Sequence, residues 1–189
     1  MGGKQSVILS PEEARARLTH AEIHMLEQGY ARVVRGDRSG GLSFEGFKTT
    51  LLAELSPKMP QSLAECIFNA FDRGRTGKLS FDELLCGIAI IRQGTPEEKL
   101  QLVFNSCGLK QSGRLSAKEL RSYLRLQEAY ENRAANQLLF KPGVMETNVR
   151  TLFPDPHETT VGFSEFKDWA CRYVNEGLLF WVFELDRLL

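Results

Sequence analysis

The chain has 189 residues, enough to bury a hydrophobic core as one domain or as two small lobes. Lysine plus arginine equal aspartate plus glutamate at 24 each, so no overall charge points to a nucleic-acid partner. Hydrophobic residues make up 42% of the chain, as in an ordinary globular protein, and no apolar run approaches the roughly 20 residues of a membrane-spanning helix.

The N-terminus carries a possible lipid attachment site. Residues 1–6, Met-Gly-Gly-Lys-Gln-Ser, fit the pattern for transfer of myristate to Gly2. One myristoyl chain binds membranes only marginally, so a second signal from Arg15 and Arg17 or from a partner would have to help. Because the N-terminus lacks the apolar stretch of a secretory signal, we expect a cytoplasmic protein that associates peripherally with membranes.

Two segments have the signature of a helix start. Residues 10–13, Ser-Pro-Glu-Glu, and residues 95–98, Thr-Pro-Glu-Glu, each combine a capping hydroxyl, a proline and a glutamate three residues on. The glycine at position 94 ends the preceding helix. We therefore predict a boundary there, with an N-terminal half at 1–93, which includes the acylation segment 1–9, and a C-terminal half at 94–189.

One phrase recurs four times, at residues 41–47, 78–84, 114–120 and 160–166. Each copy holds an apolar residue, a small residue, a further residue that is often aromatic, and a second apolar residue that follows an acid or glycine. This is the back half of a helix–loop–helix calcium site, in which a glutamate closes a twelve-residue loop. An acid closes three of the four loops.

The four copies predict the fold. Their aliphatic anchors Leu42, Leu79, Leu115 and Val161 follow at intervals of 37, 36 and 46 residues, so the last interval holds an insertion, which we place near 133–149. We expect Leu42 to pair with Leu79 and Leu115 with Val161 through short strand-like contacts. The predicted fold class is all-α, with two lobes of paired helix–loop–helix units.

The loop at residues 72–83 keeps the most ligands. Such a loop needs oxygen at positions 1, 3, 5, 7 and 9, a bidentate glutamate at position 12 and glycine at position 6. The donors would be Asp72, Thr76, the Lys78 carbonyl, Ser80 through water, and Glu83. Position 3 is Gly74, which has no side-chain oxygen, and Arg73 and Arg75 add positive charge. We expect at most one weak calcium site.

The other three loops, at residues 35–46, 108–119 and 154–165, each lack an essential oxygen. Their first positions are arginine, glycine and proline. We expect them to remain free of metal while still pairing and packing.

Other chemistry is poorly supported. His20 and His24 have the i, i+4 spacing that lets two imidazoles share a metal, but no third ligand is evident, so surface histidines are the favoured interpretation. No catalytic triad, phosphate-binding glycine loop or carboxylate pair stands out, and we expect no enzymatic activity. Without a C-x-x-C pair, the cysteines are expected to be reduced core residues rather than a disulfide framework. The cysteines are Cys66, Cys86, Cys107 and Cys171.

The C-terminal residues 175–189 are unusually apolar for a chain end. They would form a last helix that fills the groove of the C-terminal lobe. The alternatives are a docking surface for a partner or the seam to a further domain.

These residues resemble the neuronal calcium sensor group of EF-hand proteins. The resemblance lies in the initial Met-Gly, the defective first loop and residues 92–100, Arg-Gln-Gly-Thr-Pro-Glu-Glu-Lys-Leu, and it is most specific from Ile67 to Leu120. It implies a myristoylated, two-lobed protein with an apolar groove for a target helix. Gly2 matches the acylated glycine of the family, and Asp72 and Glu83 match the first and last ligands of its second loop.

The order Met-Gly-x-Lys, Leu-Ser-Pro-Glu-Glu-Ala and Leu-Thr-x-Ala-Glu is also similar to the N-terminal EF-hand region of an EF-hand-containing ubiquitin-specific protease. TLDc-domain proteins carry a comparable front section. On this interpretation the chain is a regulatory module related to a larger protein.

The leading functional hypothesis is a myristoylated EF-hand adaptor or regulator that binds an apolar helix of a target protein. The alternatives are a weak calcium sensor that acts through the second loop, and a non-catalytic regulatory module of a larger enzyme. The groove would be lined by apolar residues that could equally be core: Phe44, Phe47, Leu51, Phe68, Phe71, Phe81 and Leu84.

Overall fold

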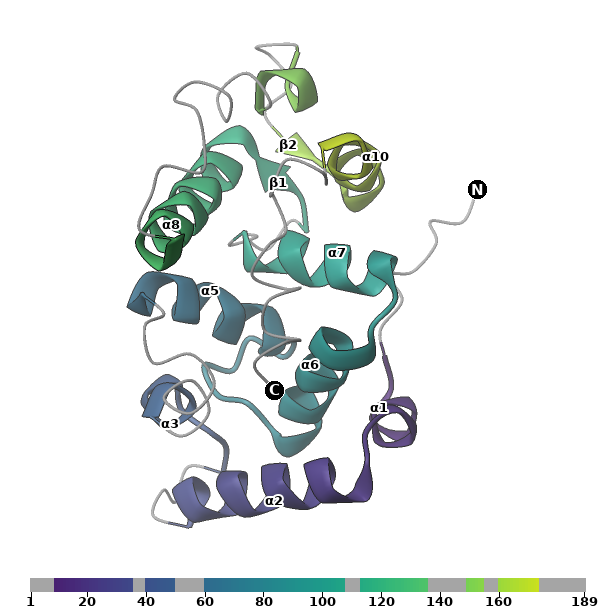
Figure 1. The fold of residues 1–189 in the computed structure, drawn as a ribbon, viewed down its shortest axis with the longest axis vertical. Coiled ribbons are helices and arrows are strands. Elements are labelled where there is room, and N and C mark those ends of the chain that lie inside the picture. The colour runs from purple at the N-terminus through teal and green to yellow at the C-terminus, as the bar shows by residue number, and fades with distance from the viewer. Residues whose placement is uncertain are drawn as a thin grey trace.

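The computed structural model describes residues 9–35, 40–49, 60–107, 113–135, 149–154 and 160–173. These residues are mainly helical, and Figure 1 shows α2 and α6 in the lower half, α7 across the middle, and the strand pair with α10 above. The elements are α1 Pro11–Arg17, α2 His20–Val34, α3 Phe44–Phe47, α5 Gln61–Phe71, α6 Phe81–Gln93, α7 Pro96–Ser106, β1 Leu115–Ser116, α8 Ala117–Ala135, β2 Thr160–Val161 and α10 Phe163–Tyr173.

The helices begin where their sequences supply a cap. The starts predicted at Ser10 and Thr95 are confirmed. Each hydroxyl accepts from the backbone N–H of the glutamate three residues on, and the carboxylate of that glutamate accepts from the backbone N–H of the serine or threonine. The same reciprocal box opens α2 at Thr19 and α6 at Ser80. Each satisfies two backbone donors that a helix end would otherwise leave unpaired.

The loops pair as predicted from their aliphatic anchors. Leu42 and Leu79 exchange two backbone hydrogen bonds, of 2.8 and 2.9 Å. β1 and β2 pair antiparallel, with Leu115 opposite Val161. All four anchors are buried, so each bridge joins two loops through backbone hydrogen bonds while its side chains enter the core.

One hydrophobic core runs through both halves of the described chain. Helix α7 contacts α5, α6 and α10, and therefore lies between the two loop pairs. On one side, the Phe47 ring packs edge-on against Phe68 and Phe71, and on the other Phe104 packs against Phe166. Each aromatic pair of this kind stabilises the fold by about 1 kcal/mol beyond the contribution of the area that it buries.

The predicted fold class is confirmed: the protein is all-α, with paired helix–loop–helix units. The break between α6 and α7 at Gly94 and Thr95 coincides with the predicted boundary. The division at 93/94 into two halves stays a prediction. Of the insertion placed near 133–149, residues 136–148 lie outside the described residues.

Two helical glycines differ in their surroundings, and this difference yields a stability test. A Cβ added at Gly87 in α6 would lie 2.5 Å from the buried Phe71 ring, whereas a Cβ at Gly29 in α2 would meet nothing within 4 Å. We expect Gly87→Ala to lower the free energy of unfolding by about 1–3 kcal/mol, because the crowded ring outweighs the gain in helix propensity. Gly29→Ala is the matched control and should raise it by about 0.5–1 kcal/mol. Urea denaturation measures both, and equal effects would contradict the prediction.

Candidate functional site

The second loop is folded around the carboxylate of Asp72. This residue caps the end of α5 and its side chain is buried. Its Oδ1 accepts from the Thr76 N–H at 3.0 Å and its Oδ2 from the Gly77 N–H at 2.7 Å. Arg75 and Gly77 have positive φ, of 51° and 76°, and these conformations turn the backbone of the loop sharply.

Glu83 closes the same loop from the start of α6. Its Oε1 accepts from the Gly74 N–H at 2.9 Å, and its Oε2 accepts from the Ser80 N–H and hydroxyl at 2.9 and 2.8 Å. Burial raises the pKa of this carboxyl, but the hydrogen bonds from the Gly74 and Ser80 backbone and the Ser80 hydroxyl outweigh burial and hold the pKa below its ordinary value. The ionised carboxylate therefore stabilises the loop without a metal ion.

The remaining predicted donors lie in the same loop. The Thr76 hydroxyl donates to the Lys78 carbonyl at 2.8 Å, and the Ser80 hydroxyl caps α6. Oxygen donors of these types fit Ca²⁺, but Gly74 adds no side-chain oxygen. Within the described ranges, no group of three or more His, Cys, Asp or Glu side chains could hold a metal. The residues thus fit calcium in donor type and fall short in number of ligands.

One arginine of the loop is directed elsewhere. The Arg73 guanidinium donates to the carbonyl of Leu9 at 3.0 Å, so this side chain fastens the segment before α1 to the loop. Arg75 is exposed. Of the arginines predicted to place positive charge near the ion, Arg73 therefore makes a structural contact instead.

The first loop has a closely packed glycine where the loop pattern requires its closing acid. At position 12 of this loop, a Cβ added to Gly46 would lie 2.6 Å from Val33 and 3.0 Å from Leu42. A glutamate does not fit there without displacing both side chains. This explains why the helix start at Ser43 is capped by the serine hydroxyl alone, which accepts from the Gly46 N–H at 3.3 Å.

The third and fourth loops are joined by an arginine. The Arg114 guanidinium donates to the hydroxyl and the carbonyl of Thr160 at 3.0 and 2.8 Å. The closing acids serve as caps: Glu119 accepts from the N–H and hydroxyl of Ser116, and Glu165 accepts from the Gly162 N–H. These interactions join the two loops through hydrogen bonds within the protein, and parts of both loops lie outside the described residues.

The predicted partner-binding residues are distributed through the core. Phe47, Phe68, Phe71 and Leu84 are buried, Phe44 and Phe81 are partly buried, and Leu51 lies outside the described residues. In this conformation most of these side chains face other parts of the chain. The groove that they would form stays a prediction.

A cavity of about 710 Å³ lies beside the second loop, where α5, α7 and the start of α10 approach each other. Its walls are mixed, with Phe71, Leu102 and Phe163 among the apolar residues and Arg75 and Gln101 among the polar ones. The Oε1 atom of Gln101 is buried and has no hydrogen-bond partner. A cavity of this size can take side chains of a bound peptide.

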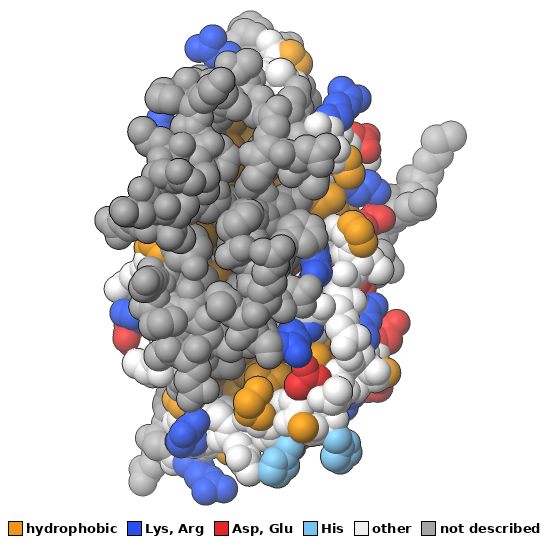
Figure 2. All heavy atoms as spheres, viewed as in Figure 1, with side chains coloured by type: hydrophobic (Ala, Val, Ile, Leu, Met, Phe, Trp, Pro, Cys, Tyr) orange, Lys and Arg blue, Asp and Glu red, His pale blue; other side chains and the backbone are white. Residues whose placement is uncertain are grey.

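The other sequence candidates lie apart from this site. The histidine side chains lie at the surface along α2, where both His20 and His24 are exposed (Figure 2). Gly2 and residues 175–189 lie outside the described residues. All four cysteines are free thiols: Cys86 and Cys107 are buried, Cys66 is partly buried and Cys171 is exposed.

Sequence reasoning missed the second role of the closing acids. The signature Ser-x-x-Glu that marks a helix start at 10–13 is also present at 80–83 and 116–119, inside the calcium-loop phrase. The loop pattern predicts Glu83 as a metal ligand and Glu119 as the acid that closes a metal-free loop, and it does not by itself show that both cap helices. The signal was present, and the loop pattern concealed it.

The paired loops, the capped exiting helices and the partial ligand set define an EF-hand protein. The comparisons with known proteins agree. The family model of the USP32 N-terminal domain matches residues 13–113, more than half of the chain, and the chain belongs to this family.

Individual relatives fall into two groups. The chain is 28% identical over 127 residues to calcium-binding protein NCSA of Dictyostelium discoideum, covering 65% of this chain and 66% of that protein. It is 33% identical over 108 residues to neuronal calcium sensor 1 of Lymnaea stagnalis, covering 54% of each. It is also 33% identical over 109 residues to human ubiquitin carboxyl-terminal hydrolase 32, covering 56% of this chain and 6% of the hydrolase. The chain thus spans about half to two thirds of the two calcium-binding relatives.

The hydrogen bonds to Glu83 predict a pH dependence of stability. We expect Glu83→Gln, which can keep the capping geometry, to lower the free energy of unfolding by about 1 kcal/mol at neutral pH. Because the pKa is lowered in the folded state, the stabilisation is complete above about pH 4.5, the ordinary value, and is lost as the pH falls through the folded value.

Urea denaturation across this pH range measures the difference between wild type and Glu83→Gln. The exposed Glu45 provides the control, since Glu45→Gln should change stability little at any pH. A difference that persists unchanged into strong acid would contradict the assigned role of the Glu83 charge.

Proposed function

We propose that this protein is a non-catalytic EF-hand regulator that binds a helix of a target protein, largely independently of calcium. The observation that carries the proposal is the double use of Glu83 and Glu119, which cap helices in loops whose metal ligands are incomplete. The helix–loop–helix frame is therefore held by protein hydrogen bonds. Recognition of a helix needs this frame and an apolar surface, and does not require the ion.

The cavity beside the second loop supports a binding role. Its apolar walls come from both sides of the α6–α7 joint, and Phe163 is only partly buried there. A target helix that inserts an apolar side chain would contact Phe163 and the walls near Leu102. The predicted groove at Phe44, Phe47, Leu51, Phe68, Phe71, Phe81 and Leu84 would have to open before a partner could reach its buried members.

Membrane association is proposed from the sequence alone. Residues 1–6 match the myristoylation pattern, and Arg15 is exposed on α1 where it could meet an anionic surface. Among the described residues, no helix has both the length and the apolar character to cross a membrane. The proposed location is the cytoplasm, with peripheral attachment through acylated Gly2. Intact mass of the protein made in eukaryotic cells, beside Gly2→Ala, tests the acylation.

Calcium binding is proposed at one weak site, with Asp72, Thr76, Lys78, Ser80 and Glu83 as donors. The support is the loop geometry together with the calcium-binding relatives. A sensor that switches through this loop is the alternative function. When bound, calcium would draw on both carboxylates, which now accept backbone N–H groups.

Restoring the missing ligand tests the calcium proposal. A Cβ at Gly74 would lie 3.3 Å from Thr76 and 3.5 Å from Glu83, so Gly74→Asp fits with small shifts. By titration calorimetry we expect wild type to bind with a dissociation constant of about 10⁻⁴–10⁻³ M, Gly74→Asp to bind at least about tenfold more tightly, and Glu83→Gln to show no binding. No heat from wild type would exclude the sensor, and no gain from Gly74→Asp would show that the loop lacks more than one ligand.

The relationship to the hydrolase supports a second candidate function. The chain aligns with 6% of that protein, and the USP32 N-terminal domain family covers residues 13–113. The chain could therefore act as the regulatory module of a larger enzyme, in cis or as a separate subunit. A transcript that continues the reading frame beyond Leu189 into a catalytic domain would favour this candidate, and a stop codon there would count against it. The TLDc arrangement stays a prediction.

Peptide binding tests the leading proposal. We expect amphipathic helical peptides to bind the full chain with a dissociation constant on the order of micromolar, equally in calcium and in EDTA, and scrambled peptides of the same composition not to bind. Phe163→Ala should weaken binding at least about fivefold, because the ring lines the cavity.

Phe153→Ala is the matched control, since Phe153 is also partly buried against the core but is not among the residues that line the cavity. Fluorescence anisotropy measures binding, and circular dichroism verifies folding. Binding that requires calcium would favour the sensor, and no binding to any amphipathic peptide would refute the proposal.

A further inference from the structure

Two inter-helix joints of this fold are tied crosswise. Each joint has two residues: Leu18 and Thr19 separate α1 from α2, and Gly94 and Thr95 separate α6 from α7. Arg17 at the end of α1 donates two hydrogen bonds to Glu98 in the first turn of α7, at 2.7 and 2.9 Å. In return, Arg92 at the end of α6 donates to Glu22 in the first turn of α2.

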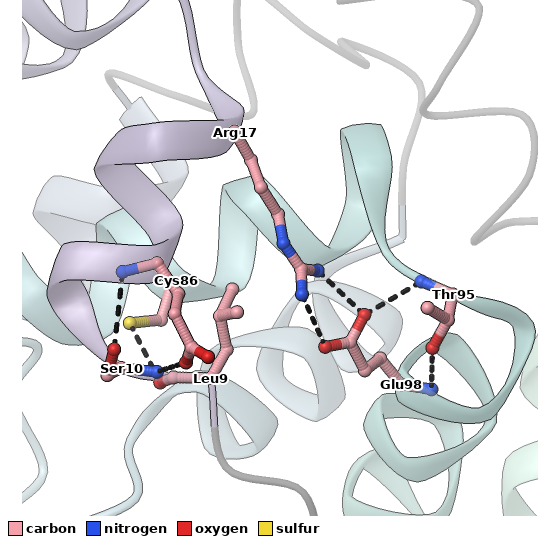
Figure 3. A network of polar contacts seen from close by, with 7 residues as sticks. Leu9, Ser10, Arg17, Cys86, Thr95 and Glu98 are labelled. Atoms are coloured by element: carbon pink, nitrogen blue, oxygen red, sulfur yellow. Dashed lines mark hydrogen bonds and ion pairs between the residues drawn. The ribbon is translucent and has the colours of Figure 1, made fainter.

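The Arg17–Glu98 pair is the more buried of the two. The Glu98 side chain is 4% exposed and that of Arg17 27%, whereas the surface pair of Arg15 and Glu27 is 45% and 48% exposed. The forked geometry and the burial make this contact stronger than an exposed ion pair. The hydrogen bond from Arg17 is the largest cause of the lowered pKa of Glu98. Glu98 also accepts from the Thr95 N–H at 2.7 Å, so one carboxylate holds both the joint and the arginine (Figure 3).

The segment that bears Arg17 is fastened at its other end too. The Leu9 side chain is 1% exposed, and its carbonyl accepts from Arg73 of the second loop at 3.0 Å. The same carbonyl accepts from the Cys86 thiol of α6 at 3.4 Å (Figure 3). Between these ends, α1 lies along α6 and buries Ala14 completely. Residues 9–18 thus cross α6 from the second loop to the start of α7.

We propose that residues 9–18 act as a strap that fixes the angle between α6 and α7, and with it the relative placement of the two loop pairs. The strap contacts the helices on both sides of the joint. Its helix α1 packs against α6, and its Arg17 binds Glu98 of α7. Lys167 of α10 donates to the neighbouring Glu97 at 3.0 Å. The first turn of α7 therefore links the strap to the pair formed by the third and fourth loops. Release of the Arg17–Glu98 fork would let the two pairs move relative to each other.

The test compares two arginines on the same short helix, in the full chain and in EDTA. Arg17→Gln removes the fork, and Arg15→Gln removes the exposed pair with Glu27. We expect Arg17→Gln to raise amide hydrogen exchange at residues 14–18 and 95–98 by a factor on the order of 10 to 100, with little change in α5 and α8. Arg15→Gln should leave all four regions within about twofold of wild type.

Residual dipolar couplings measure the joint itself. In wild type and in Arg15→Gln, the couplings of α6 and α7 should fit the structure with one common alignment tensor. In Arg17→Gln, the two helices should require separate alignment tensors. Glu98→Gln, which can keep the cap at Thr95, should reproduce the Arg17→Gln result, and Arg17→Lys, which keeps the charge without the fork, should fall between wild type and Arg17→Gln.

Two outcomes would overturn the strap. One is exchange that rises equally in α5 and α8, since the fork would then contribute only to global stability. The other is that the couplings of α6 and α7 in Arg17→Gln still fit the structure with one common alignment tensor. If Arg17→Gln fails to fold, the same comparison is made with Arg17→Lys and Glu98→Gln.

Discussion

A glutamate carboxylate in the first turn of a helix is the interaction on which this structure depends. Six glutamates each accept from the backbone N–H of the residue three positions earlier, and so fix six helix starts within the described residues: Glu13, Glu22, Glu83, Glu98, Glu119 and Glu165. Each such cap contributes about 1 kcal/mol, and it also fixes the direction in which the chain enters the helix. Where two helices are joined by only two residues, as α1 and α2 or α6 and α7 are, that direction determines how the helices can pack.

The caps explain why a calcium-loop phrase persists where ligands are missing. In the second loop, Glu83 holds the position of the bidentate ligand of an ion, and its carboxylate also accepts three hydrogen bonds from Gly74 and Ser80. Loss of other ligands therefore leaves the exiting helix intact. Gly46 shows the converse, because close packing against Val33 removes the space for an acid and the serine cap remains alone. The scaffold and the metal chemistry are separable because different atoms support them.

Local features of the fold and the loop pairings that follow from the repeat could be predicted from sequence, and other contacts between distant segments could not. The helix starts at Ser10 and Thr95 and the loop bridges at Leu42 and Leu115 follow from spacings within a few residues or from the repeat. The ligand set of the second loop stays a prediction. The Arg17–Glu98 fork joins residues 81 positions apart, and neither residue differs in its local pattern from an exposed one. Likewise, helical spacing marks Phe68 and Phe71 as apolar-face residues, but whether that face meets a partner or the rest of the chain depends on tertiary packing.

The Arg17–Glu98 ion pair between α1 and α7 also helps to explain the end of the range matched by the family model. The USP32 N-terminal domain family matches residues 13–113, a range that includes α7 and ends within the third loop, just before β1. A helix–loop–helix count would assign α7 to the second loop pair. The Arg17–Glu98 ion pair and the packing of α7 against α5 and α6 assign it equally to the first half. On physical grounds α7 is shared: its first turn is held by the N-terminal segment, while its far end supplies Phe104 to the aromatic cluster of the second pair. The matched range 13–113 therefore keeps Arg17 and Glu98 together, although it begins within the strap.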